Sequence, residues 1–302
     1  MNINNLEELL KVKRNTKMKL AVVACHDEEV LESVVESSKL GIAEPILIGD
    51  KEKTNEIAKE KALDISSFQI IDEKDLTLAA EIGVKLVSNG QANFIMKGLV
   101  DTSILLKAVL NKDWGLRTES LLSHVMVYEI PTYSKLLYLT DGGMNLKPNL
   151  EDKIKIINNS VIVAKALGRN VVKVACLAAK EKVDTKMEAT VDASKIKNRY
   201  EEGEFQEGVI VDGPMALDLA ISKKSAEVKG YISEVAGEAD ILLVPNIEMG
   251  NGIGKSITYF AEGKSAGIIM GAKAPIVLVS RADTHESKLY SIALGSAIAN
   301  YL

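Results

Sequence analysis

Residues 20–48, LAVVACHDEEVLESVVESSKLGIAEPILI, contain the pattern that decides the fold. The apolar run Leu20–Ala24 has the length and composition of a buried β-strand, and residues 28–40 carry apolar side chains at the spacing of an amphipathic helix. A second apolar run follows at Ile46–Ile48. A strand, a helix and a second strand in this order predict a parallel βαβ unit with a right-handed crossover.

The same alternation continues along most of the chain. Further apolar runs of strand length, separated by segments of helical length, lie at residues 68–71, 94–96, 171–177, 209–211, 241–244, 267–270 and 274–280. Residues 123–130 and 135–140 differ, because two runs joined by a short turn predict an antiparallel hairpin. We therefore predict an α/β protein with mostly parallel, mixed sheets.

Length and charge narrow the class of protein. With 302 residues the chain is long enough for one large or two medium domains. A net charge of -5 gives no overall positive field for nucleic acid or an anionic membrane, which favours small-molecule ligands. The two cysteines lack the spacing of a disulfide framework or a metal site, and no apolar run approaches the ~20 residues of a membrane span. We expect a cytoplasmic protein without a metal, a membrane segment or a nucleic-acid partner.

The run at 274–280 delivers Ser280 and Arg281 to the carboxyl end of a predicted buried strand, the edge at which open α/β sheets bind ligands. Arginine is rare here, with five among 37 basic residues. Its planar fork matches phosphate or carboxylate oxygens two at a time. Arg281 is therefore either an anion-binding residue or a solvated charge at a loop position.

Three other glycine-containing turns follow predicted strands. The segment 96–103 carries Lys97, Thr102 and Ser103 at a helix start, where amides and hydroxyls cradle anions or simply cap the helix. The turn at 141–145 offers Asp141 and Asn145. The segment 241–256 ends in Gly-Lys-Ser, but its glycine spacing fits neither a Walker A loop nor a dinucleotide fingerprint. We expect it to be a polar, glycine-rich loop with a helix only near 257–262.

Taken together, these segments resemble the phosphate acetyl/butyryltransferase family. The likeness rests on Lys97-Gly98-Leu99-Val100-Asp101, Leu139-Thr140-Asp141-Gly142-Gly143-Met144-Asn145, Val211-Asp212-Gly213-Pro214, Pro245-Asn246-Ile247-Glu248-Met249-Gly250-Asn251 and Ser280-Arg281. It covers essentially the whole chain, and the Thr-Asp-Gly-Gly-Met-Asn segment is more similar to the butyryl branch than to the acetyl branch.

The resemblance implies a two-domain α/β/α fold of the isocitrate/isopropylmalate dehydrogenase-like type. Domain 1 would comprise residues 1–141 and 268–302, domain 2 residues 142–267, and the active site would lie in the cleft between them. The implied reaction is reversible transfer of a short-chain acyl group, butyryl rather than acetyl, between coenzyme A and orthophosphate by direct attack in a ternary complex. Coenzyme A is then a co-substrate, acyl phosphate a product, no cofactor stays bound, and a homo-oligomer is the expected assembly.

The same resemblance implies the site residues. Arg281 and Ser280 would hold phosphate, and Asp283 and Glu286 are candidates for the base. The remaining residues expected to bind phosphate or coenzyme A are Lys97, Thr102, Ser103, Asn145, Asn246, Glu248, Gly250, Asn251 and Lys255.

One departure from the family leaves alternatives open. Acetyl-specific relatives have an aspartate, their suggested thiol base, about six residues beyond the arginine, where this chain has Ser287. Asp283, His285 or Glu286 could replace it, or coenzyme A could react as a thiolate without help. The alternatives to the butyryl enzyme are an acetyl-specific enzyme, a metal- and NAD-dependent hydroxy-acid dehydrogenase of the same fold, and a non-catalytic protein that binds coenzyme A or phosphate.

Overall fold

The computed structural model describes residues 2–12, 17–279 and 283–302. Its strands are β1 (Met18–Val23), β2 (Ala43–Gly49), β3 (Gln69–Asp72), β4 (Phe94–Lys97), β5 (Ser123–Glu129), β6 (Leu137–Thr140), β7 (Val172–Leu177), β8 (Val209–Met215), β9 (Ile241–Leu243), β10 (Lys264–Met270) and β11 (Ile276–Val277). Its helices are α1 (Leu6–Leu10), α2 (Glu28–Lys39), α3 (Lys51–Glu60), α4 (Leu76–Ser88), α5 (Thr102–Val109), α6 (Leu150–Ala166), α7 (Glu188–Glu201), α8 (Leu217–Ile221), α9 (Lys223–Val228), α10 (Ile247–Phe260) and α11 (His285–Tyr301). The predicted α/β class is confirmed.

The chain divides into two compact units. The terminal unit comprises Leu6–Ser120 and Ala266–Leu302, and the central unit comprises Met1–Asn5 and Leu121–Ser265. The hairpin strands therefore belong to the central unit, whereas the sequence analysis placed them with the chain ends. The reason is strand pairing, because β6 lies parallel to β9, with Thr140 beside Leu243.

In the terminal unit the strands follow the order β3-β2-β1-β4-β11-β10. β1 is parallel to both β2 and β4, as the βαβ pattern predicted, and β11 is parallel to β4. β10 runs antiparallel to β11. The pairing of β1 with β4 sets Val23 opposite Lys97, so the carboxyl ends of these two strands lie at the same edge.

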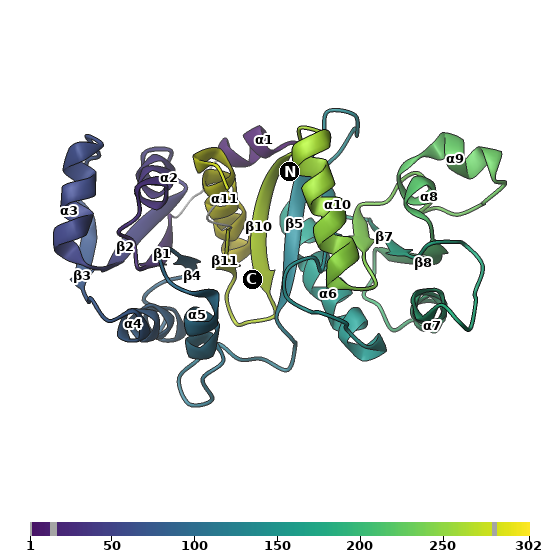
Figure 1. The fold of residues 1–302 in the computed structure, drawn as a ribbon, viewed down its shortest axis with the longest axis horizontal. Helices are drawn as coiled ribbons and strands as arrows, with labels where there is room; N and C mark the ends of the chain where they lie inside the picture. Colours follow the sequence, from purple (N-terminus) through teal and green to yellow (C-terminus); the bar gives the residue numbers. More distant parts are fainter. Residues whose placement is uncertain (1, 13–16, 280–282) are drawn as a thin grey trace. The chain divides into compact units, whose positions relative to one another are not determined.

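Helices cover both faces of this sheet, since neighbouring side chains of β4 point to opposite sides. Phe94 faces α11, where a Cβ added at Gly295 would lie 2.9 Å from its ring. Ile95 faces α4, where a Cβ at Gly83 would lie 3.3 Å from its Cδ1. Figure 1 shows α2 beside α11 and α4 beside α5. Capping side chains of Asp27 and Asp75 begin α2 and α4.

In the central unit the strands follow the order β5-β6-β9-β7-β8. β5 and β6 form the predicted antiparallel hairpin, with Val127 beside Tyr138. β6, β9, β7 and β8 are parallel. Side chains of β6, β7 and β9 pack with α8 and α10 in one apolar cluster that includes Leu139, Leu242 and Leu219. The mixed, mostly parallel sheet arrangement is confirmed here too.

Two local predictions were wrong. The strand expected at 209–211 was too short, because β8 continues through Asp212-Gly213-Pro214 to Met215. Residues 247–256 were expected to be a loop, but they form the first ten residues of α10. Asn246 begins this helix by accepting a hydrogen bond from the N–H of Met249 at 3.0 Å. The helix forms although each glycine costs about 1 kcal/mol of helix propensity, because tertiary packing outweighs propensity.

No helix in the described ranges is long and apolar enough to cross a membrane.

Phe94 packs between the terminal sheet and α11 and is 0% exposed, so Phe94→Ala should remove about 3–5 kcal/mol from the free energy of unfolding. Phe260, at the end of α10, is 90% exposed, and Phe260→Ala should change the same quantity by less than about 0.5 kcal/mol. Urea unfolding followed by circular dichroism measures both. A similar loss in both variants would contradict this assignment of the core.

Candidate functional site

The terminal unit has a pocket at the carboxyl edge of its parallel strands. Residues from four elements or the loops beside them line it: Asp27, Val30, Lys97, Gly98, Leu99, Val279 and Lys288. Val279 directly precedes Ser280 and Arg281 in the sequence, and Lys288 lies in the first turns of α11. Two lysine side chains therefore line this pocket, together with one aspartate, Asp27.

Gly98 allows the backbone to pass very close to the end of β1. Its N–H donates to the carbonyl of Val23 at 2.8 Å, and the N–H of Leu99 donates to the carbonyl of Ala24 at 2.8 Å. A Cβ on Gly98 would lie 2.3 Å from the Ala24 oxygen, a distance that real Cβ atoms do not reach. The wall of the pocket therefore requires glycine at this position.

Lys97 is buried at the end of β4, with 7% of its surface exposed. Its ammonium donates to the carbonyls of Gly98 at 3.2 Å and Val100 at 3.0 Å. These two bonds fix the ammonium at the wall of the pocket, a position from which an ammonium can also contact an anionic ligand.

The other predicted residues of the terminal unit are placed as follows. Thr102 and Ser103 open helix α5, half-buried and exposed respectively. Asp283 is half-buried, and its backbone carbonyl accepts from the Lys288 ammonium at 2.5 Å. Glu286 accepts from the phenol of Tyr290 at 2.9 Å. Ser280 and Arg281 lie outside the described residues.

Lys288 is the residue of this pocket that the sequence analysis missed. It is 3% exposed, in a helix whose inner positions are otherwise almost all apolar or small. A lysine in such a stretch is a signal that can be recognised in the sequence, because a buried ammonium needs specific partners.

In the central unit, the carboxylate of Asp141 organises the turn that follows β6. Its Oδ1 accepts from the N–H groups of Gly143 and Met144, both at 2.9 Å. Its Oδ2 accepts from the N–H of His124 at 3.1 Å and from the Nδ2 of Asn145 at 2.6 Å. Asp141 is 2% exposed, so these charge-assisted bonds replace its hydration.

The same turn packs against the start of α10. A Cβ on Gly250 would lie 2.6 Å from the Cα of Gly142, so the two backbones touch through paired glycines. The N–H of Ile247 donates to the carbonyl of Leu146 at 3.0 Å. Asn145 and Gly250, two residues expected from the sequence, are therefore held on adjoining backbone segments.

The remaining predicted residues of this unit lie on or beside α10. Asn246 is the helix cap, and its side-chain oxygen is used for that role. Glu248, Asn251 and Lys255 are exposed. The ammonium of Lys255 lies 5.9 Å from the centre of the Tyr259 ring. Because these residues are on a helix and not in a loop, their backbone amides beyond the first turn are used within the helix.

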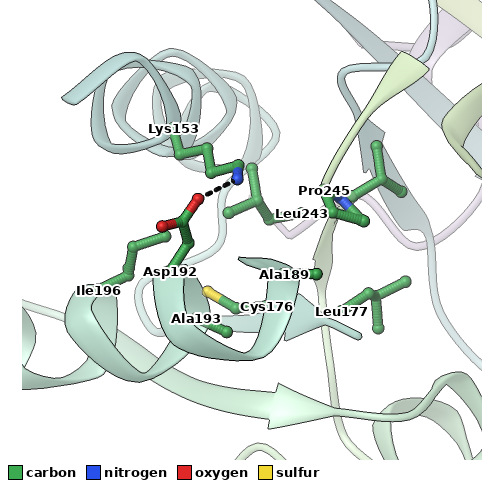
Figure 2. A pocket seen from close by; sticks show the side chains of 10 residues that line it. Lys153, Cys176, Leu177, Ala189, Asp192, Ala193, Ile196, Leu243 and Pro245 are labelled. Atoms are coloured by element: carbon green, nitrogen blue, oxygen red, sulfur yellow. Dashed lines mark hydrogen bonds and ion pairs between the residues drawn. The ribbon is translucent and has the colours of Figure 1, made fainter. Parts of the chain in front are cut away.

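A second pocket lies in the central unit under α6 and α7, and Figure 2 shows its lining. Its walls are mostly apolar, including Leu177, Leu243 and Ile196. In Figure 2, Lys153 reaches across from α6 to Asp192 on α7, and the two groups are 2.6 Å apart. Both residues are buried, so the ion pair joins the two helices.

The two cysteines lie in the cores, away from solvent. Cys25 is fully buried, and burial raises the pKa of its thiol. Burial likewise raises the pKa of Cys176 to about 12. Burial lowers the pKa of His26, the residue that follows Cys25. Thiols held neutral in this way are poor nucleophiles. In the described ranges, no three His, Cys, Asp or Glu side chains form a group that could hold a metal ion.

Comparison with known proteins identifies the family of this chain. The family model described as phosphate acetyl/butaryl transferase matches residues 5–82 and 73–296. The chain belongs to this family.

Similar proteins of the family come from several bacteria. The phosphate butyryltransferase of Clostridium beijerinckii is 46% identical over 98% of both chains. The phosphate acetyltransferase of Thermotoga maritima is 40% identical over 97% of this chain and 99% of its own. Among solved structures, a branched-chain phosphotransacylase from Enterococcus faecalis superimposes with a TM-score of 0.83 at 32% identity, covering 93% of this chain and 99% of its own.

The role of Asp141 gives a testable prediction. Asp141→Asn replaces one acceptor oxygen by an NH₂ group that faces N–H donors, so it should lower the free energy of unfolding by about 3 kcal/mol. Asp113→Asn, at an exposed position, should change it by less than about 0.5 kcal/mol. Denaturant titration of both variants measures the difference, and equal stabilities would refute the organising role of the Asp141 carboxylate.

Proposed function

We propose that this protein is a phosphate butyryltransferase, which reversibly transfers a short-chain acyl group, butyryl, between coenzyme A and orthophosphate. The observation that carries the proposal is the pocket lined by Lys97, Lys288 and Val279, the residue that directly precedes Ser280-Arg281 in the sequence, in a chain of this family. The nearly full-length similarity to a butyryltransferase supports the choice of acyl group.

The reaction needs two anionic substrates held together more than it needs a strong nucleophile. An orthophosphate oxygen attacks the thioester carbonyl, the new C–O bond forms, and the C–S bond breaks to release coenzyme A as the thiolate. Bringing the two reactants into contact removes much of the entropic barrier. Cationic and N–H groups aimed at the phosphate and at the carbonyl oxygen stabilise the charge that develops in the transition state.

In this proposal Arg281 holds the phosphate with its two-pronged guanidinium, and Ser280, Thr102 and Ser103 donate nearby. The ammonium of Lys97 adds positive charge, held rigidly by two backbone carbonyls. Coenzyme A is a co-substrate, and no bound cofactor takes part. The other proposed substrate contacts are Asn145, Asn246, Glu248, Gly250, Asn251 and Lys255.

In the reverse reaction a base would accept the thiol proton of coenzyme A. Asp283 and Glu286 are the two proposed candidates. Glu286 accepts a hydrogen bond from the Tyr290 phenol, and the backbone carbonyl of Asp283 accepts one from Lys288. Ser287 cannot serve as this base, and its N–H donates to the Thr284 hydroxyl at 3.2 Å as part of the α11 cap.

The same proposal includes a cytoplasmic homo-oligomer that acts on acyl-CoA, orthophosphate and acyl phosphate and has no nucleic-acid or membrane partner.

Turnover with a series of acyl-CoA substrates tests the function directly. Release of free thiol from acetyl-, butyryl- and hexanoyl-CoA in the presence of orthophosphate should be greatest for butyryl-CoA. One or two methylene groups contribute about 1–3 kcal/mol, so a preference of about 10- to 200-fold in kcat/KM is expected. Faster turnover of acetyl-CoA would favour the acetyltransferase alternative, and binding of coenzyme A without turnover would favour a non-catalytic protein.

The assigned role of Arg281 makes a sharper prediction. Arg281→Ala should lower kcat/KM by about 10²–10³-fold, the usual cost of losing one charge-stabilising group. Arg281→Lys should recover little, because an ammonium cannot make the paired contacts of a guanidinium.

Arg199 provides the matched control, since it lies on α7 and pairs with Glu151 and Glu204 at the surface. Arg199→Ala should keep kcat/KM within about twofold, because exposed ion pairs contribute little. Thermal melting verifies that every variant is folded. Activity near that of the wild type in Arg281→Ala would refute the proposed role.

A further inference from the structure

The solvent-facing side of α10, in the central unit, combines an aromatic ring with a lysine. Tyr259 is 67% exposed, and the ammonium of Lys255, one turn earlier in the helix, lies 5.9 Å from the centre of its ring. This distance is near the outer limit of a cation–π contact. The face of the ring and the cation are therefore presented to solvent side by side.

Helical geometry places both residues on one stripe of α10. Asn251, Lys255 and Tyr259 are spaced four positions apart, so their side chains follow one another along the same face. All three are exposed, whereas Gly254 is buried on the side of the helix that faces the core. A Cβ at Gly252, beside the stripe, would meet no atom within 4 Å. The surface next to the stripe is therefore open to a ligand at this point.

The chemistry of this stripe fits the nucleotide end of coenzyme A. An aromatic ring stacks on the face of a purine base, and an ammonium beside it contacts the phosphate groups of the same nucleotide. A second copy of the chain is the alternative occupant. However, lysine and glutamate are depleted in the cores of protein interfaces, and Lys255 and Glu248 both lie on this face and are exposed. The charges therefore favour the nucleotide.

The length of α10 is also compatible with this ligand. Asn145 and Gly250, two of the proposed substrate contacts, lie together at the start of the helix. A rise of about 1.5 Å per residue places Tyr259 about 14 Å along the helix axis from Gly250. In coenzyme A, the extended pantetheine arm and the pyrophosphate together span more than this distance between the sulfur and the adenine. One molecule can therefore reach both ends of the helix.

We propose that Tyr259 and Lys255 form a subsite for the nucleotide end of coenzyme A, in which the Tyr259 ring stacks on the adenine and the Lys255 ammonium contacts a phosphate group. This inference rests on the proposed function, and it adds Tyr259, a residue outside the motifs of the sequence, to the contacts of coenzyme A. The subsite binds the end of the substrate that is farthest from the reacting sulfur. It therefore contributes to affinity and leaves the chemical step unchanged.

Binding of 3′-phosphoadenosine 5′-diphosphate to the full-length protein tests the subsite without turnover. In isothermal titration calorimetry, Tyr259→Ala should raise the Kd about tenfold or more, because the stacking contact is lost. Tyr259→Phe keeps the ring and should keep the Kd within about twofold of the wild type. Phe260→Ala is the matched control, because this ring is 90% exposed but lies five residues from Lys255, on a different side of the helix. It should leave the Kd unchanged.

Kinetics with two thioesters assign the effect to the nucleotide. With butyryl-CoA and orthophosphate, Tyr259→Ala should raise the KM for the thioester about tenfold or more and keep kcat within about twofold. With butyryl-pantetheine, which lacks the nucleotide, the same substitution should change neither constant by more than about twofold. Equal increases of KM for the two thioesters would overturn the proposal, because the ring would then act on another part of the substrate.

The binding experiment has outcomes that decide against the subsite. No binding of 3′-phosphoadenosine 5′-diphosphate to the wild type, or an unchanged Kd in Tyr259→Ala, would exclude it. A lower mass of Tyr259→Ala in light scattering, with an unchanged Kd, would assign the ring to an interface between copies of the chain. If the wild type lacked acyl transfer but bound this nucleotide through Tyr259, the proposed function would fail and the subsite would stand.

Discussion

The parallel pairing of β1 with β4 is the constraint on which the candidate site depends. It sets Val23 beside Lys97, so both strands end at one edge, and the hydrogen bonds of Gly98 and Leu99 continue the pairing for two residues beyond the strand. This continuation is possible only because Gly98 has no Cβ. The tied backbone then turns into α5, and its carbonyls hold the ammonium of Lys97. The register of β1 and β4 thereby fixes the position of the Lys97 ammonium.

The central unit uses the same physical means at its own carboxyl edge. Gly142 and Gly250 bring two backbone segments into contact. A single buried carboxylate, Asp141, accepts hydrogen bonds from N–H groups of the turn that follows β6. In each unit, glycine permits the close approach and one buried charge fixes the result. The two buried groups differ in sign, since the Lys97 ammonium donates to carbonyl oxygens whereas the Asp141 carboxylate accepts from N–H groups.

Burying a charged group costs free energy, so the partners of each buried charge indicate whether the group serves packing or function. Lys153 and Asp192 neutralise one another between two helices, which is a role in packing. Lys97 and Lys288 line one pocket and donate to backbone carbonyls, and Lys288 also pairs with Glu29. The two cysteines, whose thiols burial keeps neutral, contribute to the cores. Cationic side chains that line a pocket are suited to an enzyme of anionic substrates.

The sequence by itself determined the α/β class, the hairpin and the candidate motifs, because apolar periodicity and strand-end glycines are local properties of the chain. It could not predict that residues 247–256 are helical, since one of the glycines that disfavour a helix locally, Gly250, is required by contact with Gly142. Nor could it assign the hairpin to the central unit, which depends on pairing between Thr140 and the distant Leu243. The partners of Lys288 could not be predicted either, because Glu29 comes close to it only when α11 packs against α2. Tertiary structure decided each of these points, since each depends on a contact between residues that are distant in sequence.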